Sequence, residues 1–209
     1  GPYEVAVVDT DPRRLAIAGG DARAAAAATA TPVTVSEHAH HSAALDGADA
    51  VVVSIGVGLQ ESIRPDFEIP ARYGLRQTVA DTVGIGAVIR ILRTAPVLAG
   101  LAEEMQRQCP DALLLNVTNP MAMCCMALHR MAPAVRTVGL CHSTWQTAAT
   151  VADLLHIPVE ELDFAGAGVN HQVFLTRLWH HGTDVYPRLR ELARTDPEFG
   201  RTVRADMLR

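Results

Sequence analysis

The sequence has few cysteines and no long run of apolar residues or of one charge. Its 209 residues include four cysteines, Cys109, Cys124, Cys125 and Cys141, without the spacing of a secreted disulfide framework. The net charge of −5 is spread along the chain, so we expect neither nucleic acid nor a membrane as a partner. No apolar run approaches the ~20 residues that cross a bilayer, and the start lacks a signal-peptide pattern. These absences favour a cytoplasmic protein with small-molecule partners.

Apolar segments of strand length alternate with segments of helical composition over the first two thirds of the chain. The expected strands lie at residues 3–9, 33–36, 50–55, 111–120 and 136–141. Helices are expected at residues 12–30, near Ala43 and at 84–109, where Pro96 predicts a kink, while residues 60–81 suggest a polar link containing prolines. This alternation predicts an α/β fold with a doubly wound parallel sheet.

The last third of the sequence changes in character. Residues 162–186 suggest a long extended segment that turns at Gly182, and the polar residues 187–209 suggest helix. We therefore expect two domains, the doubly wound α/β domain at residues 1–143 and the beginning of a second, α+β domain at residues 144–209.

Three motifs in fixed order give the sequence a family resemblance. The motifs "DALLLNVTNPMAM", "TVGLCHS" and "AGAGVNH" resemble those of glycoside hydrolase family 4, and "YGLRQTVADTVGIGAVIRILRTAPV" resembles its α-galactosidase branch. The resemblance implies a Rossmann-like domain related to lactate and malate dehydrogenases. It also implies NAD and a divalent metal, usually manganese, as cofactors. In that family a first strand with a glycine-rich phosphate loop comes before the segment that matches Tyr3, and the catalytic tyrosine lies beyond Arg209.

The resemblance implies that Cys141 and His171 bind the metal. A thiolate and an imidazole suit manganese, iron, cobalt or nickel, and leave positions open for two substrate oxygens. From the residues alone, the alternative is a buried cysteine in the core and a hydrogen-bonded histidine in a turn.

Two further residues are candidates for acid–base chemistry. His142 follows Cys141 and is expected to act as a general acid or to contact a sugar hydroxyl. Asp81 precedes the expected long helix, where it either caps the helix or raises the basicity of the catalytic tyrosine.

The remaining candidates bind substrate or cofactor. Asn119, and more weakly Asn170, are expected to bind sugar hydroxyls, although asparagine is also common in turns. Asp9, in preference to Asp11, is expected to bind the adenosine ribose of NAD. Gly56 and Gly58 would let the backbone approach the cofactor. Five other histidines are interpreted as solvated: His38, His40, His41, His180 and His181.

The resemblance implies a glycosidase that oxidises the sugar at carbon 3, eliminates the aglycone with metal assistance and adds water. We expect an unphosphorylated α-galactoside or related uronide as substrate, because "SIGVGLQ" lacks the arginine that would bind a phosphate. We also expect a homo-oligomer, either a dimer or a tetramer. The alternatives are a hydroxy-acid dehydrogenase of the same fold and a non-catalytic protein that binds a nucleotide or a sugar.

Overall fold

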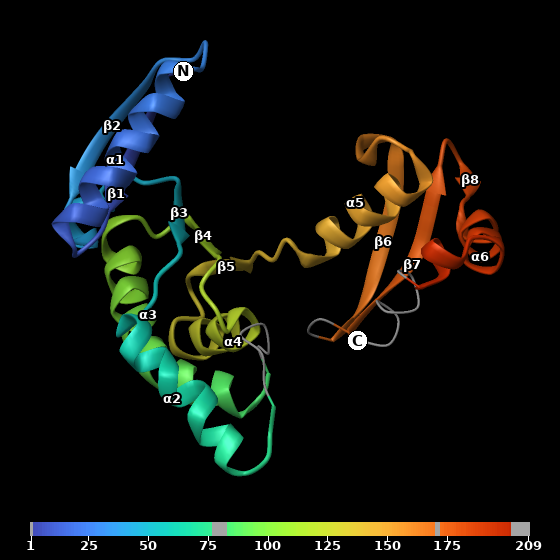
Figure 1. Cartoon of the computed structure of the whole chain (residues 1–209). Coiled ribbons are helices and arrows are strands. Elements are labelled where there is room, and N and C mark those ends of the chain that lie inside the picture. The colour runs from blue at the N-terminus through green and yellow to red at the C-terminus, as the bar shows by residue number, and fades with distance from the viewer. Residues whose placement is uncertain (1, 77–82, 170–171, 202–209) are drawn as a thin grey trace. The chain divides into compact units, whose positions relative to one another are not determined.

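The structure is a computed structural model that describes residues 2–76, 83–169 and 172–201. The chain divides into two compact units, Gly1–Leu140 and Cys141–Arg209. Figure 1 shows the elements of both units in chain order. Each unit is described separately below.

The first unit opens with a parallel βαβ motif. It consists of β1 (Tyr3–Val8), α1 (Pro12–Ala27) and β2 (Val33–His38), and α1 packs against both strands (Figure 1). The helix begins as the sequence predicts: Pro12 occupies its first turn, and the Asp11 side chain accepts hydrogen bonds from two backbone N–H groups of that turn.

A second parallel sheet follows in the same unit. Its strands lie side by side in chain order: β3 (Ala50–Val53), β4 (Leu113–Asn116) and β5 (Arg136–Gly139). The connections contain η1 (His41–Ala43), α2 (Leu59–Arg72), α3 (Ile85–Gln108) and α4 (Met121–Met131). Among the described strands, β1 and β3 do not pair with each other, and each keeps one edge without a partner strand.

The core of the first unit lies between this sheet and its helices. The side chains of Leu98 and Met105 in α3, Leu114 in β4 and Leu128 in α4 are almost completely buried. The helix α3 packs against α2 and α4 and contributes more residues to this core than any other element. The long apolar helix expected from the sequence is thus a core element of an α/β unit.

The helix α3 is also long and apolar enough to cross a membrane, judged by length and composition alone. Its buried residues Leu98, Leu101, Ala102 and Met105 nevertheless belong to the core just described. Arg90 and Arg93 on the same helix bind a buried carboxylate, as described next.

Residues 60–72 of the segment expected to be a polar link instead lie in the helix α2, with Pro65 and Pro70 inside it. That expectation was wrong because a tertiary interaction outweighs the low helix propensity of proline. The side chain of Asp66, which is 2% exposed, accepts hydrogen bonds from Arg90 Nε at 2.9 Å and from Arg93 Nη1 at 2.8 Å. This ion cluster joins α2 to α3.

The second unit combines helices with an antiparallel sheet. Its elements are α5 (Ser143–Leu155), η2 (Val159–Glu161), β6 (Leu162–Val169), β7 (Gln172–His180), β8 (Thr183–Asp184) and α6 (Tyr186–Thr195). The long extended segment predicted from the sequence forms the hairpin of β6 and β7, and Gly182 turns the chain with φ 78°. Leu155 and Leu178 are fully buried in its core.

The Asp66 cluster gives a stability prediction. Burial disfavours the charged carboxylate, but the hydrogen bonds and charges of Arg93 and Arg90 lower its pKa below the ordinary 3.8. Asp66→Ala leaves both arginines without this partner, so we expect the free energy of unfolding in urea to fall by about 3 kcal/mol at pH 7. Because the folded pKa is lowered, the difference should be fully present above pH 4 and disappear as the pH falls further.

The control for this prediction is Glu68→Ala, on the same helix. Glu68 pairs with Arg64 at the surface, where both side chains are at least 45% exposed. This change should cost less than about 1 kcal/mol. Equal losses in the two variants would contradict the assigned role of Asp66.

Candidate functional site

The carboxyl ends of the three strands in the second sheet are tied together by the segment Asn116–Thr118. The backbone N–H of Val117 donates to the Val53 carbonyl at 2.9 Å, and that of Leu140 donates to the Asn116 carbonyl at 2.9 Å. Ligands of parallel α/β sheets gather at this edge. The predicted residues Gly56, Asn119 and Cys141 all follow these strand ends in the sequence.

Two buried side chains fix the loops that leave this edge. Thr118, 3% exposed, accepts a hydrogen bond from Ile55 N at 2.9 Å and donates one to the Val53 carbonyl at 3.3 Å. Asn116, fully buried, accepts from Thr118 N and donates to the Thr118 carbonyl, both at 3.2 Å. The sequence reasoning missed both residues, although two polar residues in the apolar stretch "LLLNVT" were a signal for them.

Asn119 follows this hydrogen-bonded segment directly. Its side chain is exposed, and its peptide bond to the buried Pro120 is cis. Pro120 precedes α4, whose residues Met121 and Cys125 pack against the end of β5. The exposed amide of Asn119 is therefore held in place by two buried neighbours, Thr118 and Pro120. Such support is what a substrate contact requires.

The loop between β3 and α2 contains both predicted cofactor glycines. Gly58 has φ 78°, a conformation that favours glycine, and it precedes the first turn of α2. A Cβ atom added to Gly56 would meet no atom within 4 Å, so its backbone is open to close approach.

Cys141 and His142 lie at the beginning of the second unit, immediately before α5. Both are exposed, and the Cys141 Sγ lies 3.2 Å from the Ser143 Oγ. The strand β5 ends at Gly139, two residues earlier than expected. His142 occupies the N-cap position of α5, but its side chain makes no capping hydrogen bond. The thiol and the imidazole are therefore on the surface rather than in a core.

Gly166 in the motif "AGAG" brings β6 close to the start of α5. A Cβ atom added there would lie 3.2 Å from Thr144 Cγ2 and 3.0 Å from Val173 Cγ1. Because Thr144 comes three residues after Cys141, the strand that leads toward position 171 packs beside the helix that begins just after the predicted metal-binding cysteine. Three other predicted residues, Asp81, Asn170 and His171, lie outside the described residues.

Asp9 follows β1, as predicted, and is bound by Arg14. Arg14 Nε donates to Oδ2 at 2.9 Å, and Arg14 Nη2 and the backbone N–H of Asp11 donate to Oδ1, each at 2.8 Å. These hydrogen bonds, above all those of Arg14, lower the pKa of Asp9 from 3.8 to about 2. Asp11 instead caps α1 through its Oδ1. Asp9 Oδ2 accepts a single hydrogen bond, from Arg14, and can accept another.

Comparison with known families agrees with these motifs. Residues 2–157 match the Family 4 glycosyl hydrolase description, and residues 166–209 match that of the Family 4 glycosyl hydrolase C-terminal domain. The chain belongs to glycoside hydrolase family 4. The family resemblance inferred from the three motifs is thereby confirmed.

The family relatives differ in their substrates. The chain is 38% identical over 208 residues to an α-galactosidase of Bacillus subtilis strain 168, covering 99% of this chain and 47% of the relative. It is 33% identical over 148 residues to an α-galacturonidase of Thermoanaerobacterium saccharolyticum, covering 68% of this chain and 32% of the relative. The chain thus spans about half the length of the α-galactosidase, and its match covers about a third of the α-galacturonidase.

Solved structures confirm the fold class. A 6-phospho-α-glucosidase from gut microorganisms, solved with NAD and Mn²⁺, has a TM-score of 0.80 at 22% identity, covering 92% of this chain and 44% of that one. Malate dehydrogenase of Plasmodium falciparum, solved with NADH, has a TM-score of 0.66 at 12% identity, covering 98% and 59%. The chain has the expected Rossmann-like α/β fold, related to the dehydrogenases.

The contact of Asp9 with Arg14 gives a prediction about ionisation. In Arg14→Ala, we expect the pKa of Asp9 to rise from about 2 toward 3.8, followed by carboxyl ¹³C chemical shifts in an NMR pH titration. It should stop short of 3.8, because the backbone hydrogen bond from Asp11 remains. Arg13→Ala, a change at the next residue, should leave the titration unmoved. An unchanged pKa of Asp9 in Arg14→Ala would refute the pairing of Asp9 with Arg14.

Proposed function

We propose that this chain is part of a glycosidase that uses NAD and a divalent metal to cleave an unphosphorylated α-galactoside or related uronide. Membership of family 4 supports the reaction class. The observation that carries the proposal is the close packing of Gly166 against Thr144, because it joins the strand that leads toward His171 to the helix that follows Cys141. The helix that follows Cys141 and the strand that precedes His171 in the sequence are thereby packed together.

Cys141 and His171 are proposed to bind the metal, manganese or another divalent transition ion. The exposed thiol of Cys141 fits this role, because a ligand to an exchangeable ion with open positions must be reachable from solvent. When bound, the metal would polarise two sugar oxygens and NAD would accept a hydride from carbon 3.

The side chains of this chain are proposed to position the sugar and move protons. His142 is exposed and its ring is not used in capping α5, so it can donate a proton to the departing glycosidic oxygen. Asn119 has an exposed amide between buried neighbours and is proposed to bind sugar hydroxyls. Asn170 is proposed as a second contact. Asp81 is proposed to increase the basicity of the catalytic base.

NAD is proposed to bind along the loops after β1 and β3. Asp9 Oδ2 receives a single hydrogen bond from Arg14 and can accept another from a ribose hydroxyl. The same negative charge would repel the additional phosphate of NADP. The backbone at Gly56 is open enough for close approach of the cofactor. We also propose that the enzyme is a homo-oligomer and acts in the cytoplasm.

The metal and substrate proposals are tested on the full-length protein with a panel of α-galactoside, α-galacturonide and 6-phospho-α-glucoside. We expect Mn²⁺-dependent turnover on the first or second. In Cys141→Ser and in His171→Ala, turnover should fall by at least ~100-fold, and Mn²⁺ binding measured by electron paramagnetic resonance should weaken in parallel.

The control variants are Cys109→Ala and His129→Ala, in the first unit. His129→Ala repeats the change made at His171, and Cys109→Ala likewise removes a thiol. Both positions lie outside the proposed site, so Mn²⁺ binding should remain. Turnover on 6-phosphoglycosides alone would refute the substrate proposal. Full metal-dependent turnover in Cys141→Ser and His171→Ala would refute the assignment of these two residues as metal ligands.

The cofactor proposal is tested by calorimetry of the full-length protein with NAD and NADP. We expect NAD to bind at least ~10-fold more tightly, and Asp9→Ala to reduce this preference by weakening NAD and relieving the repulsion of NADP. Asp11→Asn retains an N-cap residue and should leave the preference intact. Tighter binding of NADP, or an unchanged preference in Asp9→Ala, would exclude Asp9 as the ribose contact.

A further inference from the structure

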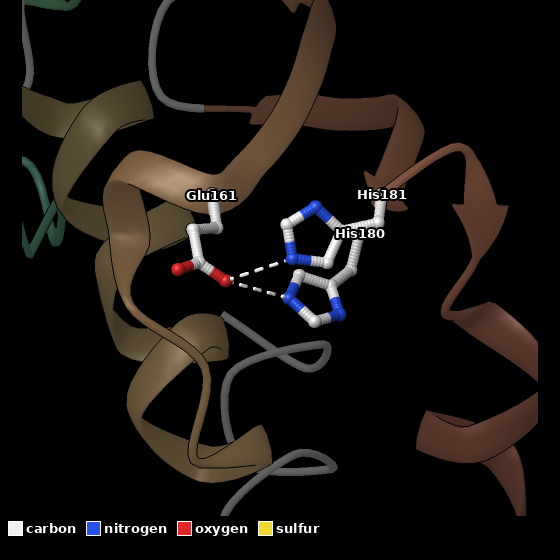
Figure 2. Close-up of side chains that lie close together, drawn as sticks. All are labelled: Glu161, His180 and His181. Atoms are coloured by element: carbon white, nitrogen blue, oxygen red, sulfur yellow. Dashed lines mark hydrogen bonds and ion pairs between the residues drawn. The ribbon is translucent and has the colours of Figure 1, made fainter.

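Three side chains of the second unit converge at the end of the antiparallel sheet, apart from the residues assigned above. Glu161 Oε2 lies 3.0 Å from His180 Nε2 and 3.1 Å from His181 Nε2 (Figure 2). One ligand atom from each residue lies within 4.8 Å of the other two. Two imidazoles and a carboxylate thus point toward one small volume.

The strand register explains why these residues meet. Leu162 at the start of β6 pairs with His180 at the end of β7, so Glu161, one residue earlier, lies opposite the turn that follows His180. His181 has φ 47° and Gly182 has φ 78°, which begins this turn toward β8. Two consecutive histidines can therefore face the same carboxylate, although neighbouring side chains along a regular strand point to opposite faces.

We propose that Glu161, His180 and His181 form a binding site for a divalent late transition-metal ion, with Zn²⁺ the best match. Tetrahedral ligands bound to zinc at ~2.0–2.2 Å stand about 3.3–3.6 Å from one another, so the two N···O distances need to lengthen by only a few tenths of an ångström. Two imidazoles and one carboxylate are a donor set that zinc commonly accepts. Two nitrogen ligands among three favour zinc, copper or nickel over magnesium or calcium.

The alternative is a pair of hydrogen bonds with no metal. Both rings then share a single carboxylate oxygen, and Figure 2 shows the second oxygen of Glu161 turned away from them. The ring centres are only 4.2 Å apart, so both Nε2 atoms face the same carboxylate oxygen. One metal ion would replace both protons and interact favourably with all three groups at once.

The cluster is accessible and one ligand is already ionised. The side chains of Glu161, His180 and His181 are 44%, 30% and 70% exposed, which leaves room for water or another ligand on the ion. The hydrogen bond from His180, with the charges of the two histidines, lowers the pKa of Glu161. A bound ion would link the start of β6 to the turn between β7 and β8, so metal should stabilise this end of the sheet.

The site is tested with Zn²⁺ alone on the untagged full-length protein in a Cys141→Ser/His171→Ala background. This background removes the proposed catalytic metal ligands, so the result is independent of the proposed function. We expect about one Zn²⁺ per chain by competition with a chromophoric chelator. Adding His180→Ala or Glu161→Gln should weaken Zn²⁺ binding by at least ~10-fold. Loss of a residue that only hydrogen-bonds to a metal ligand already reduces metal affinity by about that factor.

Matched controls are Glu160→Gln, the neighbouring exposed carboxylate, and His129→Ala, an exposed histidine in α4. Both should bind Zn²⁺ like the background protein, and circular dichroism checks that each variant is folded. If His180→Ala does not fold, the isosteric Glu161→Gln decides. The proposal fails if the background binds no Zn²⁺, or if folded variants of the cluster bind it as tightly as the controls do.

Discussion

The hydrogen bonds of Asn116 and Thr118 are the constraint on which the rest of the candidate site in the first unit depends. They connect the ends of β3, β4 and β5 through buried groups. Ile55, which Thr118 binds, is followed by Gly56, and Leu140, which Asn116 binds, is followed by Cys141. A buried polar group that loses its partner costs about 1–3 kcal/mol, so these contacts also make the loop positions hard to change.

The separation of the parallel strands into two sheets follows from the order of strands in a Rossmann fold. That order is 3-2-1-4-5-6, with the first strand in the middle. If β1 takes the second position, as its motif suggests, β2 and β1 correspond to 3-2, and β3, β4 and β5 correspond to 4-5-6. The central position, between β1 and β3, is not filled by any described strand. The exposure of Val5 (41%) and Val52 (65%) agrees with this, because strands of parallel sheets are normally buried.

The strands and the helices α1, α3 and α6 are predicted from the sequence, because apolar periodicity reports directly on which residues are buried. The helices α4 and α5 were not among the expected elements. The sequence pattern fails at α2, where Pro65 and Pro70 suggest a link but Asp66 binds two arginines more than twenty residues away. Such a contact leaves no local pattern. The same limit applies to His180 and His181, interpreted as solvated residues, because their shared neighbour Glu161 is brought to them only by the pairing of β6 with β7.

The family motifs carry structural information beyond their proposed ligands. In "TVGLCHS", a Cβ atom at Gly139 would lie 2.3 Å from Met121 Sδ and 2.8 Å from Cys125 Sγ. In "AGAGVNH", Gly166 has the corresponding role against Thr144 and Val173. Each motif therefore places a glycine at a close contact a few residues before a proposed metal ligand. A larger residue at either glycine would require these neighbouring side chains to shift. The two glycines thus constrain the packing of segments that flank the proposed ligands.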